Sequence, residues 1–138
     1  MFEAIDRFWL ASEMGDLVEA RLQITEAKER GADDFIILRF EAYMSFSSGK
    51  YQQAAESYTK AFSLRPSTKL LNNIAYSYWR QGDLAKTETT LDKMLEIVPH
   101  DFQAKRLQAN VWLLQGKLEL AISAFEKINN YKADILFE

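Results

Sequence analysis

The chain has 138 residues and no cysteine; 48% of its residues are hydrophobic, 27% are charged, and its formal net charge is −3. This length suits about one globular domain, and the composition is ordinary for that class. The missing cysteines exclude disulfides and thiolate metal sites, and no apolar run approaches the ~18 residues of a membrane span. The acidic N-terminus is unlike a signal peptide, and the net charge argues against a nucleic-acid binder.

The charge is unevenly distributed along the chain. Residues 1–34 hold nine acids and four bases, a local charge of −5, whereas residues 35–138 together sum to +2. We expect a cytoplasmic protein, or a periplasmic one if the sequence is a fragment of a longer chain.

Four glycines divide the sequence into units of equal length. Gly15, Gly49, Gly82 and Gly116 are separated by 34, 33 and 34 residues. A fixed period in this range is typical of stacked helical repeats. Apolar or small residues recur 2, 5, 9 and 12 positions after each glycine, close to the 3.6-residue period of a helix, and mark one buried face. The position five residues after the glycine holds the small side chains that let two helices approach, with Thr87 as the one β-branched departure.

The pattern predicts eight helices in four antiparallel pairs and no strands. In chain order the predicted pairs are 2–14 with 17–30, 35–48 with 51–64, 68–81 with 84–97, and 102–115 with 118–129. Asp33, Ser67 and Asp101 are placed to accept hydrogen bonds from the first backbone N–H groups of three of these helices. Pro66 and Pro99 stop the second helices of the middle pairs.

These motifs resemble the tetratricopeptide repeat (TPR), a 34-residue helix–turn–helix unit. The second unit matches best, and the residues that carry its match are Gly49, Tyr51, Ala54, Tyr58, Ala61 and Pro66. The third and fourth units also fit, except that Ala133 stands where proline is usual, and the first unit fits least. The resemblance covers the chain as one domain with repeats at 1–34, 35–67, 68–101 and 102–135. Residues 136–138 would then begin a further or capping helix.

The resemblance implies an all-α, right-handed superhelix in which the first helix of each pair lines a concave groove that binds a peptide segment. The groove residues that we expect to contact this peptide, carried over position by position, are Trp9, Arg39, Phe40, Tyr43, Phe46, Lys69, Asn73, Tyr76, Trp79, Arg80, Arg106 and Asn110. Rigid aromatic side chains and basic groups suit a peptide with apolar anchors and acidic residues. An alternative stays open, especially for Phe40 and Tyr43: these aromatics pack against the next repeat instead. Tyr78 and Trp112 lie on the opposite side of their helices and are predicted to be core.

The sequence offers no constellation for catalysis, and we expect a non-enzymatic scaffold without cofactor or metal. His100 is the only histidine, and it follows a proline in a predicted loop. The carboxylate clamp of some co-chaperone TPR domains is also unlikely to apply, because only Asn73 matches its pattern. An RNA-binding helical repeat fits poorly with the 33–34 spacing and the acidic first repeat.

Two alternatives to a peptide-binding scaffold remain at this point. One is a small bacterial secretion chaperone of the same repeat family. The other is a structural or self-association domain of a larger regulatory protein, because the apolar residues Ile135, Leu136 and Phe137 suggest a truncated fifth unit or a docking segment. We therefore expect either a fragment of a longer protein or a homo-oligomer formed through the C-terminal end.

Overall fold

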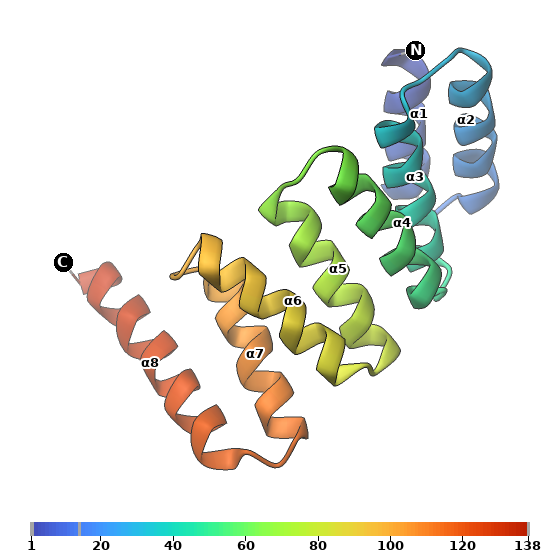
Figure 1. Ribbon diagram of the computed structural model, residues 1–138. Coiled ribbons are helices and arrows are strands. Elements are labelled where there is room, and N and C mark those ends of the chain that lie inside the picture. Colours follow the sequence, from blue (N-terminus) through green and yellow to red (C-terminus); the bar gives the residue numbers. More distant parts are fainter. Residues whose placement is uncertain (1, 14, 138) are drawn as a thin grey trace.

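The computed structural model describes the backbone of residues 2–13 and 15–137, and the side chains of residues 6–13 and 15–130. Within these ranges the chain forms eight α-helices and no strand. They are α1 (Phe2–Glu13), α2 (Leu17–Glu29), α3 (Asp34–Ser47), α4 (Tyr51–Leu64), α5 (Thr68–Gln81), α6 (Leu84–Ile97), α7 (Phe102–Leu114) and α8 (Leu118–Phe137). Each helix packs against the next in the chain, and Figure 1 shows the resulting elongated array, from α1 at the upper right to α8 at the lower left.

All eight predicted helices are confirmed. Seven agree with their predicted bounds to within one residue, and the predicted end of the eighth is wrong. The helix predicted to end at residue 129 continues to Phe137, so residues 136 and 137 belong to α8 and do not begin another helix. The reason is that this repeat lacks a stop signal. Pro66 and Pro99 follow the ends of α4 and α6, whereas Ala133 stands at the corresponding position in α8 and is a strong helix former.

The turn inside each pair depends on its glycine. Gly82 ends α5 with φ of +87°, in the left-handed region that a Cβ makes costly. Its N–H donates to the Trp79 carbonyl at 3.0 Å, and the Asp83 N–H donates to the Tyr78 carbonyl at 3.0 Å. The Asp83 carboxylate then accepts from the Lys86 N–H and starts α6. Residues that close one helix and open the next are thus contiguous, which keeps the hairpin tight.

The three predicted N-caps are also confirmed. The Asp33 carboxylate accepts from the Phe35 N–H at 2.8 Å, the Ser67 hydroxyl from the Leu70 N–H at 3.2 Å, and the Asp101 carboxylate from the Ala104 N–H at 2.9 Å. Each satisfies a backbone donor that has no partner within its own helix. These caps fix where each new repeat begins.

The small side chain five residues after each turn glycine allows the paired helices to approach closely. Ala20, Ala54 and Ala121 are fully buried, and so is Thr87. Threonine is tolerated there because its hydroxyl donates to the Asp83 carbonyl at 2.8 Å and leaves no buried polar group unpaired.

The buried residues fall into two groups. The N-terminal cluster joins α1, α2 and α3 through Phe8, Ala11, Ala20, Ile24, Ala27, Ile37, Phe40 and Met44. The central cluster joins α3 to α7 through Ala42, Ala54, Tyr58, Ala61, Leu70, Leu71, Ile74, Ala75, Leu91, Met94, Ala104, Leu107 and Val111. Tyr78, predicted as core, is partly buried against the central cluster. Trp112 is not part of either cluster.

Candidate functional site

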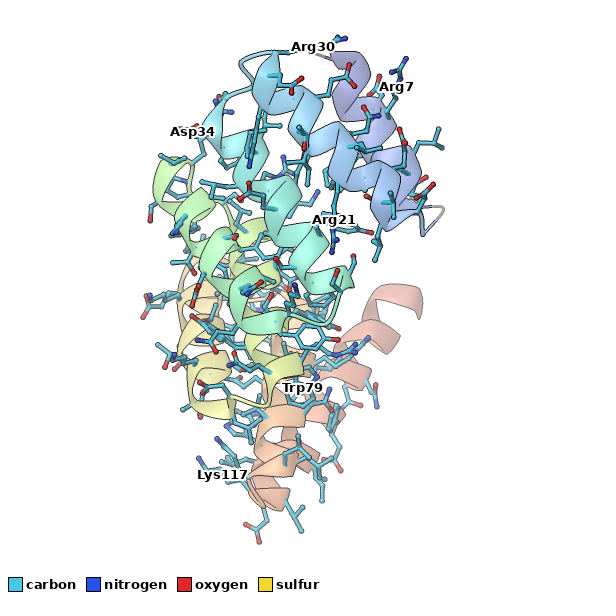
Figure 2. All side chains as sticks on the ribbon, turned by 90° about the vertical axis from the view of Figure 1, so that its right-hand side faces the viewer. Arg7, Arg21, Arg30, Asp34, Trp79 and Lys117 are labelled. Atoms are coloured by element: carbon cyan, nitrogen blue, oxygen red, sulfur yellow. The ribbon has the colours of Figure 1, made fainter. Side chains whose placement is uncertain are left out.

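The predicted groove residues lie on α1, α3, α5 and α7, the first helices of the four pairs. We call this surface the groove face. Lys69, Tyr76, Arg80 and Arg106 are exposed on it, and Figure 2 shows Trp79 midway along the array. The half-buried members are Trp9, Arg39, Tyr43, Phe46, Asn73, Trp79 and Asn110. The predicted contact residues thus differ in exposure, which the sequence pattern did not distinguish.

The prediction is wrong for Phe40. This side chain is only 2% exposed, and its ring stacks on that of Phe8 with centroids 3.9 Å apart. Leu107 at the equivalent position of the fourth repeat is also buried, whereas Asn73 of the third repeat is half-buried. Phe40 therefore belongs to the core.

Trp9 and Tyr43 pack around the same pair of rings. Their own rings meet edge to face at 5.4 Å, and both rings contact Phe8. These aromatics hold the first repeat against the second, as the alternative interpretation anticipated. Both stay half-buried, so each ring keeps some accessible surface next to the groove.

Arg80 is exposed but is already engaged at the turn end of α5. Its guanidinium donates to the Tyr51 hydroxyl at 2.8 Å and lies 5.1 Å from the centre of the same ring. Phe46 packs edge to face on Tyr51 as well, at 5.2 Å, and Phe46 and Trp79 both border the central cluster. These three side chains mainly stabilise the stacking of the second repeat on the third.

The residues that remain accessible on the groove face come from α5 and α7. Tyr76 is 45% exposed, an unusual exposure for an aromatic ring in the middle of an array. Lys69 of α5 and Arg106 of α7 are also exposed, and Asn73 and Asn110 are half-buried. Among the side chains that the structure describes, no carboxylate lies within ion-pair distance of Lys69 or Arg106.

An exposed leucine of α7 was not predicted as a contact residue. Leu113 is 46% exposed and stands three residues before its turn glycine, as Phe46 and Trp79 do. This repeat position was the signal that could have identified it. Leu113 adds apolar surface to the α7 side of the groove.

Tyr58 of α4 has the clearest electrostatic perturbation near this face. Burial of its hydroxyl raises the pKa of Tyr58 to about 12, while the Arg39 charge lowers it and Tyr43 raises it. Burial dominates because the ionised phenolate would lose its hydration.

This shift predicts how stability depends on alkaline pH. Below pH 10 the tyrosine is protonated in both the folded and the unfolded chain and contributes no pH dependence. Between pH 10 and 12 the unfolded chain releases the proton and the folded chain keeps it, so stability should fall as pH rises. Tyr58→Phe should remove this part of the decline, measured as unfolding free energy against pH, whereas Tyr76→Phe should leave it in place. An unchanged pH profile in Tyr58→Phe would contradict the assignment.

The described residues hold no group of three or more potential metal ligands, and none of the helices that they form is long and apolar enough to cross a membrane.

A cleft of about 440 Å³ opens between α7 and α8, outside the groove face. Trp112 lines this cleft, which corrects the prediction that Trp112 is core.

Comparison with known proteins identifies the family. A family model described as tetratricopeptide repeat matches residues 45–101 and 72–134, which together span most of the chain. The chain belongs to the tetratricopeptide repeat family. Arrays of this family serve as protein–protein interaction scaffolds and are generally not enzymes themselves. No curated protein sequence matches the chain significantly.

Solved structures share this superhelical fold. A tetratricopeptide repeat protein from Parabacteroides merdae matches with a TM-score of 0.79 and 24% identity, over 94% of this chain and 52% of that one. The Cut9–Hcn1 hetero-tetramer of the APC/C matches with a TM-score of 0.75 and 16% identity, over 91% of this chain and 26% of that one. A mutant O-GlcNAc transferase from Thermobaculum terrenum matches with a TM-score of 0.66 and 18% identity, over 80% of this chain and 21% of that one. The chain thus spans about half or less of each of these proteins.

Proposed function

We propose that the chain binds a linear segment of another protein on the groove face, centred on α5 and α7. The observation that carries this proposal is Tyr76, a residue that is 45% exposed in the interior of the array. The helices α5 and α7 also expose two cations, Lys69 and Arg106, that have no ion-pair partner in the described part of the chain. An exposed aromatic ring offers apolar contact area with little entropy to lose, as in known interface hot spots.

The neighbouring side chains favour a particular kind of peptide. Asn73 and Asn110 carry both donors and acceptors and suit the backbone amides of an extended segment. Lys69 lies two helical turns before Tyr76, about 10 Å along the axis of α5. The peptide would therefore place an apolar side chain against Tyr76 and Leu113, and a carboxylate near Lys69 or Arg106.

The charge distribution also favours one placement along the array. Asp6 and Glu13 of α1 are exposed, and the first 34 residues carry a net charge of −5. Acidic residues of a peptide would be repelled at this end and attracted toward α5 and α7. The ligand would therefore occupy the second half of the groove face rather than its whole length.

A peptide selection tests the proposal. The immobilised chain is used to enrich a displayed library of random linear peptides, and the enriched peptides are then synthesised and titrated. We expect apolar and acidic residues to be enriched. Tyr76→Ala should weaken binding about tenfold or more, a loss of about 1.4 kcal/mol or more, and Lys69→Glu with Arg106→Glu should abolish the preference for acidic peptides.

Matched variants on the outer helix α6 provide the controls. Ile97→Ala removes an exposed apolar side chain and Lys93→Glu reverses an exposed charge, both away from the groove face. Neither should change peptide affinity. Peptides that bind Tyr76→Ala as tightly as the wild type would overturn the proposed site.

A further inference from the structure

The first repeat leaves uncovered a surface that the other repeats bury. Five residues before each later turn glycine stand Met44, Ser77 and Val111, and all three are buried. Leu10 holds this position in the first repeat and is 59% exposed. Asp6 and Glu13, four residues before and three after it, are exposed on the same side of α1. We call these three residues the head face.

The described side chains of the last repeat leave the opposite surface open. In the third repeat, Leu71, Ile74 and Met94 are buried in the central cluster together with residues of α7. The equivalent positions of the fourth repeat are Lys105, Gln108 and Ile128, and all three line the cleft between α7 and α8. We call this cleft the tail face; its apolar lining includes Trp112, Leu120 and Ala124.

The two faces carry opposite charges. Around Leu10 lie the acidic residues Asp6, Glu13, Asp16 and Glu19 and one cation, Arg7, so the surface at the head face is net negative. Lys105 and Lys127 line the tail cleft, and Lys117 is exposed at the turn beside it. Figure 2 shows Lys117 at the lower end of the array and Arg7 of α1 at the upper end. The two faces therefore lie at opposite ends of the array and cannot meet within one molecule.

The contacts between neighbouring repeats show how the faces would fit. Arg80 stands two residues before the turn glycine of the third repeat. It contacts Tyr51, which stands two residues after the turn glycine of the second repeat. In the same register, Glu13 would meet Leu118, next to Lys117. Leu10 would enter the apolar cleft, in the place that Val111 of α7 fills on the third repeat.

We propose that the head face of one copy docks on the tail face of a second copy and continues the repeat stack across the two molecules. Apolar contact between Leu10 and the cleft supplies attraction, and the pairing of Glu13 with Lys117 sets the register. The contact is heterologous, so a pair of copies still offers one free head and one free tail, and assembly proceeds by addition of further copies.

Sedimentation velocity at increasing protein concentration tests this assembly. The mean mass of the wild type should rise with concentration, and more so at low salt because exposed charge pairs are screened by salt. Leu10→Glu blocks the head, and Lys105→Glu reverses a charge in the tail cleft, at the position where the third repeat buries Leu71. Each should weaken self-association about tenfold or more, a change of about 1.4 kcal/mol or more.

Mixing the two blocked variants distinguishes this geometry from a symmetric dimer. Leu10→Glu retains a working tail and Lys105→Glu a working head, so the mixture should form a 1:1 dimer that does not grow. The double variant should stay monomeric in every mixture.

A charge exchange gives a second test. Glu13→Lys and Lys117→Glu should each weaken association. An equal mixture of the two single variants should recover association through the restored opposite-charge contact.

Val18→Glu is the matched control, since Val18 is exposed on α2 outside both faces and should leave association unchanged. Far-ultraviolet circular dichroism confirms that each variant is folded. The proposal is overturned if the wild type stays monomeric at all concentrations, if Leu10→Glu associates as the wild type does, or if the two blocked variants do not pair.

Discussion

Replacing Phe40 with alanine should lower the free energy of unfolding by about 3–5 kcal/mol, the range for removing a buried aromatic ring. Phe40 is 2% exposed, stacks on Phe8 at 3.9 Å and receives the edge of Trp9 at 5.5 Å. The substitution removes both ring contacts and leaves a cavity between α1 and α3. Denaturant titration followed by circular dichroism measures the loss.

Tyr76→Ala is the control, because it removes another aromatic ring from a first helix at an exposed position. It should change the free energy of unfolding by less than about 1 kcal/mol. If Phe40→Ala were instead neutral for stability while reducing peptide binding, Phe40 would be a ligand contact and its placement in the core would be wrong.

The loss of stability in Phe40→Ala should also be confined to one part of the array. In repeat arrays each unit contacts mainly its neighbours, so damage to one interface does not spread evenly. Hydrogen exchange in Phe40→Ala should accelerate in α1, α2 and α3, which share the N-terminal cluster. Amides of α5, α6 and α7 should keep most of their protection, because the central cluster contains no residue of α1 or α2.

Helix positions were predictable because the signals that start and stop them are local. The left-handed turn glycines, the caps at Asp33, Ser67 and Asp101, and the prolines after α4 and α6 act on adjacent backbone. The end of α8 was not predictable in this way. Its expected boundary rested on the length of the other repeats, and Ala133 does not impose it.

The groove face was less predictable because exposure depends on the neighbouring repeat. Phe40, Asn73 and Leu107 share a repeat position, yet Phe40 and Leu107 are buried and Asn73 is half-buried. Arg80 was correctly placed on the surface, but its bond to Tyr51 requires knowledge of how α4 and α5 stack. A single sequence indicates on which face of a helix a residue lies. It indicates less well which residue of a neighbouring repeat covers that face.

Replacing Leu91 with alanine should lower the free energy of unfolding by about 2–5 kcal/mol. Leu91 of α6 is completely buried and belongs to the central cluster, which connects α3 to α7. Ile97→Ala, on the same helix but 61% exposed, should cost less than about 1 kcal/mol and serves as the control.

The two core substitutions should differ in how far their effects extend. Leu91→Ala weakens contacts shared by three repeats, so hydrogen exchange should accelerate from α4 through α7, and the denaturation midpoint of the whole array should fall. Phe40→Ala should expose mainly the first three helices, since the central cluster stays intact. Identical exchange patterns in the two variants would mean that the array unfolds as one cooperative unit and that the two clusters do not act separately.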